Sequence, residues 1–300
     1  MDLNWDDIRV FLAVARAESL SGAAQRLRLD PATAGRRIAR LEQAMGAPLF
    51  GKSPQGYALT EAGQRLLSHA ERAESAMVEG AEALSGRSGG LSGQIRVGAP
   101  DGCANYLLPQ VCRDIATANP DLDIQIVALP RVVNLSRREA DIAVAVSAPV
   151  AGRLVVQKIT DYRLSLAGAR DYLRGHAPIR GVADLGGHRI VGYIPDMIFD
   201  RELDYLSEIG VERVQLASNS VAVQVQCVRQ GGGLGILHDF ALPFAPGVRR
   251  VLPDEVRLTR SFYLLRHADD RRLERLNRFA SALADGLRAE VARLEAIAAA

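Results

Sequence analysis

The sequence predicts an α/β protein in which an N-terminal, all-α winged helix-turn-helix domain precedes a long linker helix and a two-lobed domain. Three observations support this fold class. Residues 5–46 have helical periodicity, the segment GRSGGLSG at 86–93 is typical of a flexible linker, and short β-rich runs alternate with helical runs beyond it. The corresponding boundaries are 1–59 for the winged domain, 60–90 for the linker helix and hinge, and 91–300 for the two-lobed domain.

Composition and charge narrow the classes of function. The chain has 300 residues, 48% of them hydrophobic, and a net charge of +2; its three cysteines lack CxxC spacing, so we expect no metal site and no disulfide scaffold. No apolar run reaches the about 18 residues of a membrane span, and the acidic N-terminus is unlike a secretory signal. We therefore expect a cytoplasmic protein with no membrane partner. Because the chain has no P-loop, HExxH or GxSxG motif, we also expect no enzyme activity and no cofactor.

The first 46 residues predict three helices. Apolar residues including Phe11 share one face of the first helix. Ser19 and Ser21 can both cap the second helix, and Asp30 followed by Pro31 is a favourable start for the third.

The third helix, from residue 32 to about residue 45, predicts contact with double-stranded DNA. Six basic residues and only two acidic ones lie between residues 25 and 52. A helix with a basic outer face after a tight turn is how a recognition helix enters the major groove, where arginine binds guanine and threonine contacts bases. From the charge alone, solvated surface arginines are the alternative interpretation. The candidate DNA-binding residues of the helices are Ser21, Thr33, Arg36, Arg37 and Arg40.

Residues 48–60, PLFGKSPQGYALT, predict a hairpin wing. Phe50 and Leu59 would anchor its two strands to the core of the domain. At its tip, Lys52, Ser53 and Gln55 would contact backbone phosphates.

An apolar seam along residues 60–84 predicts a long helix that pairs with another helix. Apolar residues recur at spacings of three and four from Ala62 to Leu84, and several are alanines that permit close approach. We therefore expect a homodimer or a homotetramer. Packing of the seam against its own domain is the alternative.

The first 65 or so residues resemble the LysR-type transcriptional regulators. The segments SLSGAAQRL and TAGRRIARLEQAMGAPLF and the wing ending in LTEAGQRLL carry the resemblance, which extends over the whole chain in the order of its elements. It implies a recognition helix at 31–43 and RNA polymerase as a further partner. Typical members have a serine where this chain has Gly35, and two wing arginines where it has Lys52 and Gln55. We therefore expect a weaker salt dependence of DNA binding than two arginines would produce.

From residue 91 onward, strands alternating with helices predict two α/β lobes with parallel strands. Lobe I would comprise about 91–160 and 267–300, and lobe II about 161–266. Two such lobes resemble a periplasmic-type binding protein, with a small-molecule effector bound between them. Ligands in open α/β sheets bind beyond the carboxyl ends of strands. The candidate effector-binding residues are therefore Pro100, Asp101, Gly102, Cys103, Arg131, Ser147, Tyr193, Ser218 and Asn219.

Local details of this domain carry further predictions. Strands at 154–159 and 162–167 would lead into lobe II, which would contain a helix near 199–208. Asp101 and Arg131 together would suit a zwitterionic effector, although a cap for Asp101 and an ion pair for Arg131 are alternative roles. Cys103 at a helix start would have a lowered pKa, so a thiol-based redox sensor using Cys103 is the alternative to an effector-responsive regulator.

Overall fold

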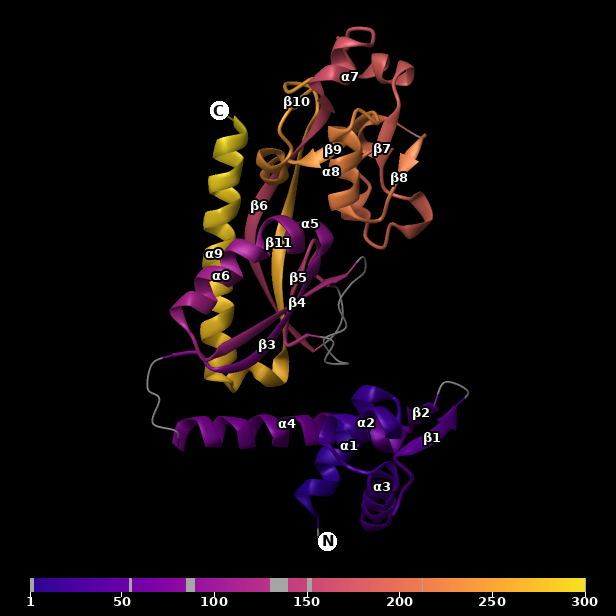
Figure 1. The fold of residues 1–300 in the computed structure, drawn as a ribbon, viewed down its shortest axis with the longest axis vertical. Helices are drawn as coiled ribbons and strands as arrows, with labels where there is room; N and C mark the ends of the chain where they lie inside the picture. Colours follow the sequence, from indigo (N-terminus) through magenta and orange to yellow (C-terminus); the bar gives the residue numbers. More distant parts are fainter. Residues whose placement is uncertain are drawn as a thin grey trace. The chain divides into compact units, whose positions relative to one another are not determined.

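A computed structural model of the chain describes residues 3–53, 56–84, 90–129, 140–149, 153–211 and 213–299. The chain divides into two compact units, Met1–Gly89 and Gly90–Ala300, each with its own hydrophobic core (Figure 1). No helix among the described residues combines the length and the apolar character needed to cross a membrane.

Three helices form the body of the N-terminal unit: α1 (Trp5–Ala17), α2 (Leu20–Leu27) and α3 (Pro31–Met45). Each begins at a side-chain cap that accepts a hydrogen bond from the first turn, and the three caps are Asn4, Ser19 and Asp30. Ser19, not Ser21, therefore caps α2, and the predicted start of α3 is confirmed. The turn between α2 and α3 is tight because Arg28 adopts a left-handed backbone conformation, with φ 54°.

A hairpin wing completes this fold. Strand β1 (Phe50–Ser53) pairs antiparallel with β2 (Gly56–Leu59). The ring centroids of Phe50 and Phe11 on α1 lie 5.3 Å apart. On α3, Glu42 Oε1 accepts hydrogen bonds from the backbone N–H groups of Leu49 and Phe50 at 2.7 and 3.2 Å. The wing is thus anchored to both α1 and α3.

The long helix α4 (Glu61–Leu84) follows the wing, and its seam divides into two parts. Ala62, Leu66 and Ala70 pack in the core of their own unit, whereas Ala73 and Met77 are exposed. Of the seam residues whose side chains the structure describes, Ala73 and Met77 are therefore the ones available for pairing with another helix.

A nine-stranded mixed sheet runs through the C-terminal unit in the order β4-β3-β5-β11-β6-β9-β7-β8, with β10 pairing with β6. In lobe I, β3 pairs in parallel with β4 and β5; in lobe II, β7 pairs in parallel with β8 and β9. The long antiparallel strands β6 and β11 connect the two lobes (Figure 1). The strands are β3 (Gly93–Pro100), β4 (Leu122–Leu129), β5 (Ile142–Ala145), β6 (Leu154–Ala169), β7 (Ile190–Gly192), β8 (Leu216–Ala217), β9 (Leu234–His238), β10 (Val248–Arg250) and β11 (Arg257–His267).

Among the described residues of this unit, the α-helices that pack against the sheet are α5 (Asp101–Tyr106), α6 (Leu108–Ala118), α7 (Arg170–Arg174), α8 (Val221–Arg229) and α9 (Glu274–Ala299). The C-terminal helix α9 contacts α6 and β6, and its buried leucines belong to the main core cluster. In lobe II, α8 contacts β9 and also α5 of lobe I. The end of β3 and the start of α8 therefore meet where the lobes join.

Two local predictions for the C-terminal unit were wrong. The strands expected at 154–159 and 162–167 form the single strand β6, because β11 pairs with it across the intervening residues. The helix expected near 199–208 is replaced by the separate 3₁₀ turns Arg201–Leu203 and Ser207–Ile209. Glu202 and Glu208 both bind Arg260 on β11, and on an α-helix side chains six residues apart would point about 120° away from each other.

Candidate functional site

The outer face of α3 carries the polar groups expected of a DNA-reading helix. Arg36 is exposed, and its Nη2 donates a hydrogen bond to Thr33 Oγ1 at 3.0 Å. Asp30 Oδ1 accepts from the N–H groups of Ala32 and Thr33 at 2.8 and 3.4 Å, which fixes the start of the helix. Thr33 and Arg36 thus form one adjacent polar pair on the helix surface.

The other two arginines of α3 are bound by acidic residues of α1. Arg40 Nε donates to Asp7 Oδ2 at 2.6 Å, and a second bond joins Arg40 Nη2 to Asp7 Oδ1. Asp7 is buried, and its hydrogen bond raises the pKa of Arg40. Arg37 Nη1 lies 3.6 Å from Asp6 Oδ2. These contacts orient the two arginines, and the sequence pattern of α3 alone gave no indication of them.

The remaining candidate DNA-binding residues lie on α2 and the wing. Ser21 is exposed in the first turn of α2. Lys52 and Ser53 are the last two residues of β1, but their side chains lie outside the part of the chain that the structure describes. Gln55 lies outside the described residues.

At the junction of the lobes, the carboxylate of Asp101 binds the start of α8. Its Oδ2 accepts from Ser220 Oγ and from the N–H of Ala222, both at 3.0 Å, and its Oδ1 accepts from Asn105 Nδ2 at 3.1 Å. Ser220 itself caps α8 by accepting from the N–H of Val223. Asp101 is therefore a capping residue across the lobe boundary, and both of its oxygens are engaged.

Ser147 makes a second polar bond between the lobes. It follows β5 of lobe I, and its Oγ donates to Asp200 Oδ2 of lobe II at 2.5 Å. Asp200 also caps the 3₁₀ turn Arg201–Leu203 through its other oxygen. The sequence rule about strand ends selected Ser147 but not Asp200, because Asp200 lies in a loop between strands.

The other candidate effector-binding residues that the structure describes differ in their burial and contacts. Gly102 is buried, and a Cβ there would lie 3.3 Å from Val221 and 3.5 Å from His238. Ser218 Oγ accepts from the N–H of Ser220 at 3.1 Å. Pro100, Tyr193 and Asn219 are half-buried, and Arg131 lies outside the described residues.

A buried aromatic cluster behind the junction was missed by sequence reasoning. Tyr162 stacks on Phe262 at 4.2 Å and on His238 at 5.4 Å between ring centroids. Burial lowers the pKa of His238 to about 3, and its Nδ1 has no hydrogen-bond partner in the described structure. No periodicity or motif marks these residues, because they come together from β6, β9 and β11.

The expected low pKa of Cys103 is wrong. The thiol is 1% exposed in the core beneath α5, and this burial raises the pKa of Cys103 well above its usual value, with a smaller contribution from Cys112. Burial also raises the pKa of Cys112, to about 11. A helix start lowers a thiol pKa only when the thiolate stays hydrated or finds a cation. Neither thiol therefore forms the reactive thiolate readily at neutral pH.

Two family models together match most of the chain. Residues 5–64 match the bacterial regulatory helix-turn-helix protein model of the lysR family, and residues 88–288 match the LysR substrate binding domain. A winged helix-turn-helix joined to an effector-binding domain of this kind defines a transcriptional regulator. The chain belongs to the LysR family of these regulators.

Individual proteins agree with this assignment. The probable hydrogen peroxide-inducible genes activator of Mycobacterium avium is 30% identical over 255 residues, covering 79% of this chain and 77% of that protein. HTH-type transcriptional regulator DgdR of Burkholderia cepacia is 35% identical over 144 residues, about half of each protein at 47% and 48%. Among solved structures, full-length LysG from Corynebacterium glutamicum with bound effector Arg has a TM-score of 0.64 and 20% identity, covering 97% of this chain and 99% of that one.

Proposed function

We propose that this regulator binds double-stranded DNA sequence-specifically and that a small-molecule effector, bound between the two lobes, changes this binding. The observation that carries the proposal is the pair of polar contacts across the lobe boundary, from Asp101 to the start of α8 and from Ser147 to Asp200. Asp101 and Ser147 follow strands β3 and β5, at the ends where open α/β sheets bind ligands. An effector that replaces or reinforces these contacts favours one lobe arrangement over another.

For DNA binding, we propose that α3 reads bases while α2 and the wing contact phosphates. Thr33 and Arg36 have the exposure needed for base contacts, and Arg37 and Arg40 are oriented by α1. Ser21, Lys52, Ser53 and Gln55 are assigned to the phosphates. The assignment of a base-reading role to α3 follows the geometry of recognition helices.

The proposed partners extend beyond DNA and the effector. The exposed seam residues Ala73 and Met77 of α4, the latter 57% exposed, are suited to pairing in a homodimer or a homotetramer. Contact with RNA polymerase is also proposed. A regulator that binds chromosomal DNA would act in the cytoplasm.

Thiol-based redox sensing by Cys103 is less well supported than effector binding. The Mycobacterium avium relative is named for hydrogen peroxide induction, but that name applies to that protein. In this chain Cys103 is buried with a raised pKa, which disfavours the thiolate that reacts with peroxide.

The test uses DNA from the intergenic region beside the gene for this regulator, in footprinting and gel-shift assays with and without candidate metabolites. We expect a protected site that is bound more weakly by Arg36→Ala and equally well by Arg113→Ala, which removes an equal charge from an exposed position on α6. We expect Ser147→Ala to retain DNA binding but to shift the effector concentration needed for half-maximal response by about tenfold. An equal effect of the two arginine variants, or an unchanged response in Ser147→Ala, would contradict the proposal.

A further inference from the structure

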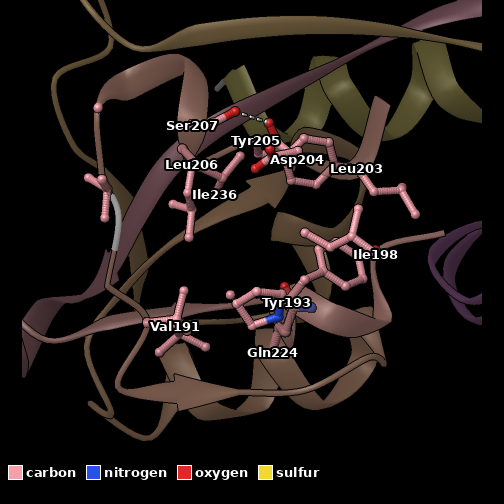
Figure 2. A pocket seen from close by; sticks show the side chains of 15 residues that line it. Val191, Tyr193, Ile198, Leu203, Asp204, Tyr205, Leu206, Ser207, Gln224 and Ile236 are labelled. Atoms are coloured by element: carbon pink, nitrogen blue, oxygen red, sulfur yellow. Dashed lines mark hydrogen bonds between the residues drawn. The ribbon is translucent and has the colours of Figure 1, made fainter. Parts of the chain in front are cut away.

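A cavity of about 470 Å³ lies within lobe II, between β7 and the segment that contains Leu203 and Leu206 (Figure 2). Its described lining residues fall between Val191 and Ile236, and Tyr193 is the only one of them that the sequence had suggested for effector binding. A cavity of about 150 Å³ is enough to hold benzene. This one therefore has room for a molecule with two or three rings.

The lining is mostly aliphatic and carries almost no charge. Val191, Ile198 and Ile236 line its apolar walls, and Figure 2 shows their side chains directed toward the central space. Asp204 is the single carboxylate among the described lining residues, which include no lysine, arginine or histidine. An anionic ligand would find no opposite charge there and would be repelled by Asp204. An uncharged ligand therefore fits better than an anionic one.

The cation near this cavity is already neutralised. The guanidinium carbon of Arg260 lies 5.7 Å from the ring centroid of Tyr205, which lines the cavity. However, Arg260 Nε lies 2.9 Å from Glu202 Oε2, and Nη2 is bonded to Glu208. Arg260 holds the segment around Tyr205 in place and does not offer a free positive charge to a ligand.

Gln224 on α8 offers the cavity one hydrogen-bond acceptor. Its side chain lines the cavity in a residue that is only 4% exposed, and its Nε2 donates to the carbonyl oxygen of Ser218 at 2.8 Å. That bond fixes the orientation of the amide and leaves Oε1 as the atom able to accept a hydrogen bond from a ligand. An acceptor on a largely buried side chain favours a ligand with one N–H or O–H group.

We propose that this cavity is a second ligand site, for an uncharged and largely apolar ring compound whose N–H or O–H group donates to Gln224. One wall of the site, Leu203–Ser207, continues from Asp200, which accepts the hydrogen bond of Ser147 in lobe I. A ligand bound at this site would therefore affect the hydrogen bond between Ser147 and Asp200 that joins the lobes. The site does not depend on the interlobe effector proposed above.

The direct test is fluorescence titration of the full-length protein with N-phenyl-1-naphthylamine, which has three aromatic rings, one N–H group and no charge. Its sulfonated relative, 8-anilinonaphthalene-1-sulfonate, provides the anionic comparison. We expect one neutral probe to bind per chain, with an affinity at least tenfold higher than that of the sulfonate. Equal affinities would overturn the proposal.

Matched variants locate the bound probe. Val214→Phe fills the cavity and is expected to weaken binding at least tenfold, whereas Val223→Phe makes the same change at a 48% exposed position outside the lining. If Val214→Phe does not fold, as judged by circular dichroism, Val211→Phe provides the same comparison. Unchanged probe affinity in a folded cavity variant would refute the site. DNA footprinting uses no probe, so the two proposals can fail separately.

Discussion

The buried carboxylate of Asp7 on α1 accepts two hydrogen bonds from the guanidinium of Arg40 on α3, one of them at 2.6 Å. This pair joins residues 33 positions apart and fixes the angle at which α3 presents its outer face. Arg36, one turn earlier on the same helix, donates a hydrogen bond to Thr33 within its own helix. The two arginines therefore have different roles in spite of their similar places in the sequence.

This difference predicts separable effects of two alanine variants. Arg36→Ala should weaken DNA binding by about 1–3 kcal/mol without changing the unfolding midpoint of the N-terminal unit, because the residue is not part of the core. Arg40→Ala should lower that midpoint as well, because it leaves the buried Asp7 carboxylate without its partner. Trp5 is the single tryptophan of the chain, so its fluorescence follows unfolding of this unit. The double variant Asp7→Asn/Arg40→Gln should recover part of the lost stability, and equal midpoints for the two single variants would contradict this assignment.

Replacing two glycines of α4 with alanine should change the stability of the protein in opposite directions. A Cβ at Gly63 would lie 2.1 Å from the carbonyl oxygen of Leu49, so Gly63→Ala should destabilise the N-terminal unit by about 3 kcal/mol or more. Gly80 has nothing within 4 Å of its Cβ position, so Gly80→Ala should stabilise the helix by about 0.5–1 kcal/mol. Urea unfolding followed by Trp5 fluorescence measures the first effect, and helical circular dichroism measures the second. Similar stability of the Gly63→Ala variant and the unaltered protein would rule out the close approach.

Replacing Gln55 tests the phosphate contact assigned to the wing. Gln55→Arg should steepen the slope of log K against log salt concentration by about 0.9, the value for one additional phosphate contact on duplex DNA. The measurement is a salt series of gel shifts on one operator fragment. Gln55→Leu serves as the control, since it adds no charge and should leave the slope unchanged. An unaltered slope in Gln55→Arg would show that the wing tip does not contact the phosphates.

His238 should make the C-terminal unit sensitive to acid. Its pKa falls to about 3 on burial, below the ordinary value near 6.5, so the unfolded chain takes up the proton first as the pH falls. The neutral, buried imidazole of His238 therefore makes its full contribution to the free energy of unfolding above about pH 6.5. This contribution is lost progressively toward pH 3, at up to about 1.4 kcal/mol per pH unit. Tyr162 and Tyr205, which face the ring, stay protonated in this range because burial raises both pKa values.

The measurement is urea unfolding at pH 7 and pH 5, followed by tyrosine circular dichroism. In His238→Phe the loss of stability between these pH values should be smaller by about 2 kcal/mol. The burial-lowered pKa of His188 acts in the same direction, so the comparison must be between His238→Phe and the unaltered protein. An identical pH dependence in both would contradict the assignment to His238.

Cys103 should react slowly with thiol reagents. Because its thiol is buried and its pKa is raised, alkylation at neutral pH should modify the half-buried Cys227 first. Mass spectrometry of peptides after timed alkylation of the native protein measures the order. Rapid loss of the Cys103 thiol, accompanied by a change in DNA affinity after peroxide treatment, would instead favour the redox alternative.

Much of the N-terminal unit could be predicted from sequence because its signals are local. Asp30 and Pro31 mark the start of α3 within two residues, and helical periodicity identifies the buried faces without knowledge of any distant contact. The same local signals suggested that Arg36 and Arg40 are equivalent. They could not reveal Asp7 as the partner of Arg40, because that contact depends on the packing of α1 against α3.

In the C-terminal unit, strand and helix patterning predicts the two-lobed α/β class and the strand ends where Asp101 and Ser147 lie. That these side chains bind Ser220 and Asp200 of the other lobe, over 119 and 53 residues of sequence, follows from the packing of the lobes. The same packing buries Cys103, which reverses the pKa shift expected from its place at a helix start. Local sequence encodes backbone conformation and caps, whereas hydrogen-bond partners and desolvation depend on which distant elements pack together.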